Sequence, residues 1–157
     1  MELSKESLSV SEREAQIRSK VTGIHHVDVT KDNIFNDEKL CGMMFDVITS
    51  SICLETASNE KKKYIASVQN VSNLLRPGGY LVMIGGIEES FYTVDKYRFP
   101  VCHLTTEEIC EIYTENGFRI LSMETVYKDE QLPEINHVDA LADNKNVFTL
   151  FAQKMPC

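Results

Sequence analysis

The stretch Phe45–Leu54, FDVITSSICL, is apolar and β-branched at both odd and even positions. This pattern is typical of a strand covered on both faces inside a parallel sheet, so we predict a buried strand here. Tyr80–Ile84, YLVMI, has the same character, and apolar residues recur at spacings of three and four over Tyr64–Leu75. We therefore predict a strand–helix–strand unit, in which the crossover is right-handed and the helix ends at Pro77-Gly78-Gly79.

Weaker patterns precede this unit and start its helix. Ser11 and Glu14 match the capping box of a short helix, and Ile24–Val29 has the composition of a brief strand. Ser58 or Asn59 is the expected N-cap of the helix between the two buried strands.

The second half of the chain predicts one more helix and two strands. Thr105 and Glu108 match a second capping box, and Asn116-Gly117 ends that helix. The late strands are Phe118–Tyr127 and Val147–Lys154, with a polar segment over 128–146 between them. We expect one α/β domain, with a helical lead-in over 1–22, a sheet body over 23–157 and antiparallel C-terminal strands.

The composition limits the classes of function. The 157 residues include 16 Lys and Arg against 24 Asp and Glu, a formal net charge of −8, and 43% are hydrophobic. This is typical of one globular domain. Because nucleic acids and acidic membranes bind to basic faces, we expect neither as a partner. No run has the length and apolarity of a signal peptide or membrane span, so we predict a cytoplasmic protein.

Cysteine and histidine spacing does not indicate a metal site or a disulfide framework. The five cysteines are widely spaced without a C-x-x-C motif, so we expect reduced, mostly buried thiols. His25 and His26 are adjacent and would point to opposite sides of the predicted strand, which makes them a poor pair of ligands for one metal ion.

Ligands of α/β sheets bind beyond the carboxyl ends of the strands, which here are followed by Asp28–Asn33, Thr49–Glu55 and Gly85–Val101. The first segment pairs a carboxylate with the next backbone N–H, an arrangement suited to the edge of an adenine. An Asp at a strand end also forms turns, so both interpretations stay open.

Five segments carry a family resemblance. They are FDVITSSICLE (45–55), NVSNLLRPGGYLVMI (70–84), SFYTVDKYRFPVCHLTTEEI (90–109), ENGFRI (115–120) and FTLFAQK (148–154). In this order they resemble the C-terminal half of the small-molecule amine N-methyltransferases that use S-adenosylmethionine, which include nicotinamide, phenylethanolamine and indolethylamine N-methyltransferases. Many Rossmann-like methyltransferases share the LLRPGG turn. The order and spacing of Ser90, Tyr92, Val94 and Phe99 are more specific and point to this family in particular. The likeness extends from Ile17 to Lys154.

The resemblance implies a Rossmann-like methyltransferase sheet that is incomplete. Members hold the methionine end of the cofactor with a Gly-rich loop after the first strand, and the ribose with an acidic residue after the second. This chain has no G-x-G, and its only glycine before Gly42 is Gly23. The first two strands and the Gly-rich loop are therefore expected to be missing, in a fragment of a longer enzyme or in a truncated form.

The resemblance names S-adenosylmethionine as the cofactor and three residues that would meet it. HVDVT resembles the segment whose Asp and following Val contact the adenine, which assigns Asp28 and Val29. Ser51, in TSSICLE, resembles a position beside the cofactor. The alternatives are a turn at Asp28, simple packing at Val29 and a backbone hydrogen bond at Ser51.

The resemblance also places the acceptor. Tyr92 would cover it, and Gly85, Gly86, Glu89 and Val101 lie where members place pocket residues. Nicotinamide-methylating members carry an acidic residue at the Gly85 position and hydroxyl side chains near Glu89 and Val101. Gly85 and Val101 cannot make those hydrogen bonds, which disfavours nicotinamide, whereas Glu88, Glu89 and Asp95 could attract a cationic amine. A solvated acidic loop is the alternative for these three acids.

Methyl transfer from a sulfonium to a neutral nitrogen is an in-line displacement, so positioning and exclusion of water are its main requirements. We assign no catalytic residue, although Glu89 could accept the proton that an aliphatic ammonium must lose.

Two functions follow. The first is S-adenosylmethionine-dependent N-methylation of a small amine or a pyridine-type nitrogen, with weak or no cofactor binding by this chain alone because the Gly-rich loop is absent. The alternative is a catalytically inactive methyltransferase-like interaction subunit, because without its neighbours the edge of Phe45–Leu54 lies open to self-association or to pairing with another chain. A dinucleotide-dependent oxidoreductase is disfavoured, since it needs the same phosphate-binding turn.

Overall fold

The structure is a computed structural model that describes residues 9–35, 37–127, 142–143 and 146–156. Most of the predicted polar segment over 128–146 therefore lies outside the described residues. In chain order the elements are α1 (Val10–Arg18), the 3₁₀ helix η1 (Glu38–Leu40), β1 (Phe45–Ser51), α2 (Lys61–Leu74), β2 (Leu75–Ile87), β3 (Phe91–Val94), β4 (Tyr97–Pro100), α3 (Thr106–Glu115), β5 (Phe118–Tyr127) and β6 (Asn146–Lys154). Within the described ranges, no helix has the length and apolarity needed to cross a membrane.

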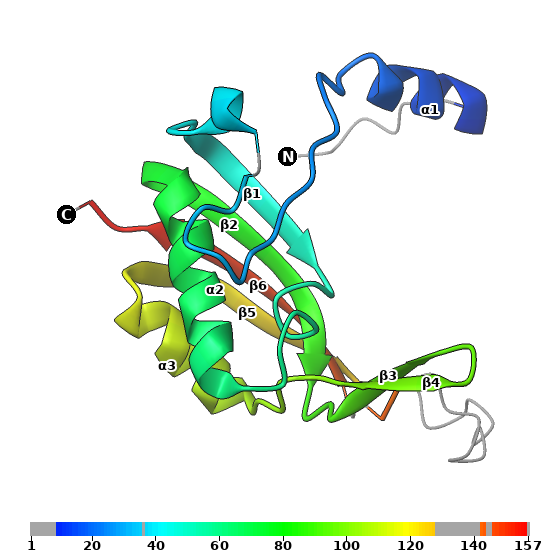
Figure 1. Cartoon of the computed structure of the whole chain (residues 1–157), viewed down its shortest axis with the longest axis vertical. Helices are drawn as coiled ribbons and strands as arrows, with labels where there is room; N and C mark the ends of the chain where they lie inside the picture. Colours follow the sequence, from blue (N-terminus) through cyan, green and yellow to red (C-terminus); the bar gives the residue numbers. More distant parts are fainter. Residues whose placement is uncertain (1–8, 36, 128–141, 144–145, 157) are drawn as a thin grey trace, which may run out of the picture.

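The main sheet has the strand order β1-β2-β6-β5. β1 and β2 are parallel, and β6 runs antiparallel to both β2 and β5. β3 and β4 form a separate antiparallel hairpin that projects from one end of the sheet (Figure 1). The predicted α/β class with antiparallel C-terminal strands is confirmed.

Helices α2 and α3 cover one face of the sheet (Figure 1). On that face Leu81 of β2 lies beside Ala152 of β6, and both side chains are fully buried. Val68 of α2 and Ile109 of α3 belong to the same apolar cluster. Burial of such side chains contributes roughly 1.5–3 kcal/mol each, so this layer is the main source of stability.

The opposite face of the sheet has no such cover in the described part of the chain. Side chains that alternate with the buried ones point to this side, and the Tyr80 and Phe151 rings stack there at 5.3 Å between centroids. We call this side the open face, and its large exposed apolar residues are Val47, Tyr80, Ile84, Val126 and Phe151.

The predicted burial of FDVITSSICL on both faces is wrong. β1 is an edge strand that pairs with β2 alone among the described strands, and Val47 is 53% exposed. Only Ile48 packs against the core from this strand. Apolar residues at both odd and even positions of a strand predict that both of its faces are buried. Here α2 and α3 cover only one face.

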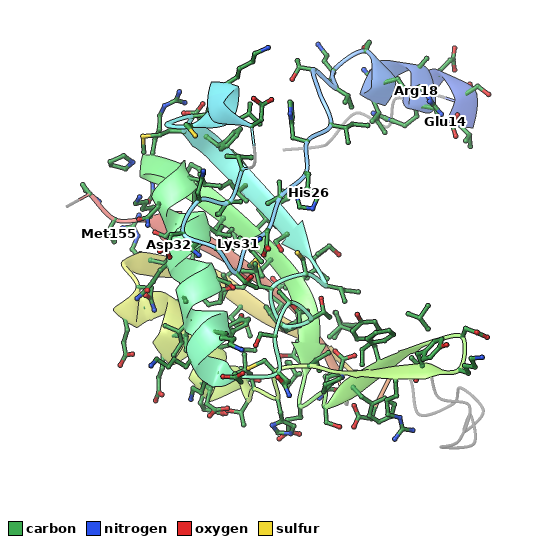
Figure 2. All side chains as sticks on the ribbon, viewed as in Figure 1. Glu14, Arg18, His26, Lys31, Asp32 and Met155 are labelled. Atoms are coloured by element: carbon green, nitrogen blue, oxygen red, sulfur yellow. The ribbon has the colours of Figure 1, made fainter. Side chains whose placement is uncertain are left out.

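The predicted strand at Ile24–Val29 is also wrong. A single antiparallel bridge joins Val27 to Phe35, and the rest of the segment is a loop. The Asn70 side chain on α2 donates hydrogen bonds to the carbonyls of Val29 and Lys31, each at 3.0 Å. This amide holds the loop against α2, where Figure 2 labels Lys31 and Asp32.

The ends of α2 differ from those predicted. Its N-cap is Glu60, which makes no side-chain cap, rather than Ser58 or Asn59. At the other end Lys154 Nζ donates to the carbonyls of Ser72 and Leu75 at 2.7 and 2.9 Å, so the helix ends there and not at the Pro-Gly-Gly sequence. Its last carbonyls are thus satisfied from β6.

The Pro77-Gly78-Gly79 sequence forms a bulge inside β2. Phe45 pairs with Leu75 and Val47 pairs with Tyr80, so β2 advances by five residues while β1 advances by two. Gly78 has a φ of +79°, a conformation that glycine adopts without strain.

The four described cysteines are free, and they are more exposed than predicted. Cys41 and Cys53 are exposed, Cys110 is half-buried and only Cys102 is buried. Within the described ranges, no group of three or more His, Cys, Asp or Glu side chains could hold a metal ion.

Two capping boxes begin helices of very different surroundings. The Thr105–Glu108 box of α3 is confirmed, whereas α1 uses Ser9 and Glu12 instead of Ser11 and Glu14. α3 buries Ile109 in the core, but α1 buries no residue and lies apart from the sheet (Figure 1).

Because α3 packs in the core and α1 does not, removal of their N-caps should affect the free energy of unfolding unequally. Thr105→Ala should lower the free energy of unfolding by about 1 kcal/mol, because the cap belongs to a helix that packs in the core. Ser9→Ala removes an equivalent cap from α1 and should leave global unfolding unchanged. Urea denaturation followed by tyrosine fluorescence measures both, and equal losses would contradict the separation of α1 from the core.

Candidate functional site

A cavity of about 360 Å³ lies at the carboxyl ends of β1 and β2, beneath the β3–β4 hairpin. We call it the hairpin pocket. It is lined by Ile52, Thr56, Gly85, Gly86, Glu89, Tyr92, Ala142 and Val147. Four predicted acceptor residues, Gly85, Gly86, Glu89 and Tyr92, are therefore brought together.

Two glycines allow carboxylates to approach the floor of the pocket. A Cβ on Gly85 would lie 2.5 Å from Glu55 Oε1 and 2.6 Å from the Phe148 ring. A Cβ on Gly86 would collide with the Glu89 carboxylate. Adjacent strand residues face opposite sides of a sheet, so the two carboxylates flank the glycine pair from opposite sides.

Glu55 is the residue of this site that the sequence analysis did not assign individually. It is 3% exposed, and its Oε1 accepts a hydrogen bond from the Gly86 N–H at 3.3 Å. Its Oε2 is buried with no hydrogen-bond partner among the described residues. Burial raises the pKa of Glu55 above its ordinary value, although backbone hydrogen bonds oppose the shift. The sequence feature that could have identified Glu55 is its position as an acidic residue directly after an apolar strand.

Glu89 and Tyr92 form the other side of the pocket. Glu89 is 6% exposed, which excludes the solvated-loop interpretation of this side chain. The Tyr92 ring stacks on Phe99 of β4 with centroids 5.2 Å apart. Arg98 lies over the Phe91 ring at 3.7 Å, so aromatic contacts join the two strands of the hairpin.

Asp28 and Val29 lie beside a second cavity. Its other lining residues are His26, Val27, Thr30, Cys53, Thr56 and Ala57. Thr56 also lines the hairpin pocket, so the predicted cofactor residues and the predicted acceptor residues lie on adjoining cavities.

The Asp28 carboxylate is held within its own turn. It accepts hydrogen bonds from Thr30 Oγ1 at 2.6 Å and Thr30 N at 3.1 Å, and it pairs with Lys31 at 3.2 Å. These bonds lower the pKa of Asp28. The turn at Asp28, which was one of the two interpretations of this residue from the sequence, is therefore present. Val29 packs against the edge of the core.

Two predicted residues lie outside both cavities. Ser51 is the exposed last residue of β1. Val101 is buried, and its N–H donates to the Ser90 carbonyl at 3.0 Å. The contacts of Ser51 with cofactor and of Val101 with substrate stay predictions.

The fold of this chain is similar to that of solved S-adenosylmethionine-dependent methyltransferases. A solved member from Methanosarcina mazei is similar to this chain with a TM-score of 0.59 and 14% identity, over 94% of this chain and 79% of that one. Another, from Clostridium acetobutylicum, has a TM-score of 0.59 and 14% identity, over 93% and 71%. At such identities the likeness shows the fold.

The sequence model of the NNMT/PNMT/TEMT family matches residues 1–155, so the chain belongs to that family. It is 30% identical to mouse phenylethanolamine N-methyltransferase, over 94% of this chain and 48% of the relative. It is 26% identical to human nicotinamide N-methyltransferase, over 92% and 51%. The chain thus spans about half the length of these relatives.

The raised pKa of Glu55 predicts a pH-dependent cost of folding. The folded state binds this proton more tightly than the unfolded chain, so stability is lost as pH rises from the ordinary glutamate pKa through the raised one. Glu55→Gln removes this charge, and its free energy of unfolding should therefore rise relative to wild type between pH 4 and pH 7.

Urea denaturation at several pH values measures this difference. Exposed Glu111→Gln is the matched control and should show a much smaller trend. A Glu55→Gln difference that stays constant from pH 4 to pH 7 would show that burial does not shift this carboxyl.

Proposed function

We propose that this chain forms the acceptor-binding part of an S-adenosylmethionine-dependent N-methyltransferase whose substrate is a small cationic amine. One observation carries the proposal: the buried carboxylate of Glu89 lines the hairpin pocket beside Tyr92, while the buried carboxylate of Glu55 lies behind the glycine pair on the other side of the sheet. Family membership supports the reaction class, because the relatives named above are N-methyltransferases.

The charges of the pocket favour an ammonium group over a neutral heterocycle. A cation near Glu89 gains more energy here than in water, because the buried site has a lower effective dielectric. Tyr92 adds an aromatic face, which attracts cations and covers the apolar part of an arylalkyl amine. A neutral pyridine carries no positive charge for the Glu89 carboxylate to attract.

Space at Gly85 supports the same choice. A Cβ at position 85 would lie only 2.5 Å from Glu55 and 2.6 Å from Phe148, so no acidic side chain fits there. Glu55, which does not line the pocket, occupies that volume behind the backbone.

In this proposal Glu89, Tyr92 and Glu55 have separate roles. Glu89 orients the ammonium in the pocket and accepts its proton before the nitrogen attacks, and Tyr92 excludes water. Glu55 adds negative potential beneath the glycines. Neighbouring Thr56 joins this pocket to the cavity at Val29, the expected adenine side.

The residues present fit only one end of S-adenosylmethionine, which would supply an electrophilic methyl group. Val27, Val29 and Ala57 give the second cavity an apolar lining suited to adenine. The sequence contains no G-x-G for the amino-acid tail. We therefore propose weak cofactor binding by these 157 residues alone.

Ligand titrations test the proposed function. By nuclear magnetic resonance, phenylethylamine should shift the amides of Gly86 and Tyr92, and nicotinamide should not. Glu89→Gln should weaken amine binding at least tenfold, because a charged hydrogen bond contributes roughly 1.5–3 kcal/mol. Glu88→Gln, the same charge change one residue away, is the control.

Two results would contradict the proposal. Nicotinamide binding as tightly as the amine would remove its electrostatic basis. Micromolar binding of S-adenosylhomocysteine to the 157-residue chain in calorimetry would refute the predicted loss of the tail-binding half.

A second candidate function is supported by the open face and by the outer edge of β1, which pairs with no other strand in the described part of the chain. We also propose that the chain associates through this edge, either with itself or with a related chain, as an interaction subunit. Backbone N–H and C=O groups on an open edge readily pair with another strand.

Light scattering over a range of concentrations tests the association. The wild-type chain should form dimers or larger species, and Val47→Lys should shift them to monomers by placing a charge on the apolar edge strand. Glu111→Lys, at an exposed position of α3, is the control substitution and should leave association unchanged. A wild-type chain that stays monomeric and captures no relative would exclude self-association as its role.

A further inference from the structure

One carboxylate holds the base of the β3–β4 hairpin. Asp143 Oδ1 accepts hydrogen bonds from the N–H groups of Ser90 at 2.7 Å and Phe91 at 3.2 Å. Its Oδ2 accepts from Ser90 Oγ at 2.5 Å. Partial burial alone would raise the pKa of Asp143, but these hydrogen bonds together lower it below its ordinary value. The bonds therefore favour the charged form, which is the better acceptor.

The residue before Asp143 contacts the hairpin directly. Ala142 forms an antiparallel bridge with Tyr92, and both residues line the hairpin pocket. Residues 142–143 thus hold the backbone of β3 at successive positions, Ser90, Phe91 and Tyr92.

The hairpin depends on its base for its position. β4 is exposed along its whole length, and Val94 at the end of β3 is exposed as well. At the base, the Val101 N–H closes the hairpin onto the Ser90 carbonyl at 3.0 Å. The Cys102 N–H also donates to the Glu55 carbonyl at 2.9 Å, and the Asp143 carboxylate adds three hydrogen bonds at the start of β3.

We propose that Asp143 is a positioning residue that sets the hairpin, and with it Tyr92, over the hairpin pocket. The proposal rests on the proposed function for the role of Tyr92 in covering the amine. Asp143 does not line the pocket. It acts through Ser90, Phe91 and Ala142, while the floor formed by Gly85 and Gly86 is built separately on β2.

Hydrogen exchange tests the positioning without any ligand. Asp143→Ala should speed exchange of the Phe91 and Thr93 amides at least tenfold and leave Leu81 and Leu150 in the main sheet unchanged. Asp143→Asn keeps one acceptor oxygen and an amide that can donate to Ser90 Oγ, so it should restore most of the protection. Asp95→Asn, at the exposed tip of the hairpin, is the matched control and should match wild type.

Amine binding then tests the link to Tyr92. Asp143→Ala should weaken phenylethylamine binding about tenfold, Asp143→Asn should bind nearly as wild type, and Asp143→Ala should add no further loss in a Tyr92→Ala background. Unchanged exchange in Asp143→Ala overturns the proposal, and so does faster exchange with full amine affinity. Faster hairpin exchange in a chain whose wild type binds no amine would support the role of Asp143 in setting the hairpin and overturn the proposed function instead.

Discussion

The structure depends on β2, which pairs on both sides, as β6 does, and is the strand that carries both a parallel and an antiparallel ladder among the described strands. Its ladder with β1 is parallel and its ladder with β6 antiparallel, so it joins the two halves of the chain. Leu81 and Met83 point from it into the layer beneath α2 and α3 and are fully buried. The carboxyl end of the same strand carries Gly85 and Gly86, which means that the core and the pocket share one backbone. Rigidity of the core is thereby passed to the floor of the site.

The pocket carries polar groups that burial disfavours. An ionised carboxylate in a dry site destabilises the fold unless it is fully hydrogen-bonded, and Glu55 Oε2 lacks a partner among the described residues. Such a group is expected where a ligand completes its interactions. Asp143 shows the opposite arrangement, since its carboxylate is satisfied by the backbone and side chain of the hairpin base. Among the described residues, Glu55 is thus a buried acid with an incomplete set of hydrogen bonds, whereas both oxygens of Asp143 accept hydrogen bonds.

Elements that depend on residues close together in the sequence could be predicted, whereas the packing around each element could not. The Thr105–Glu108 capping box and the late strands follow from nearest neighbours along the chain, and the structure contains both. The exposure of β1 depends on which strands and helices pack against it, and the sequence of β1 alone does not specify them. The Ile24–Val29 segment has strand composition, but Asn70 holds its carbonyls against α2 instead. The burial of Glu55 likewise depends on residues distant in the sequence, since a glutamate is mostly exposed in proteins.

The close approach at Gly85 restricts the order in which this pocket can change during evolution. The Glu55 carboxylate and the Phe148 ring both occupy the volume that a side chain at position 85 would need. Changes that move or shorten these two side chains must therefore precede the gain of a side chain at 85, since the reverse order passes through a clashing intermediate. The residue at position 85 is thus epistatically linked to positions 55 and 148.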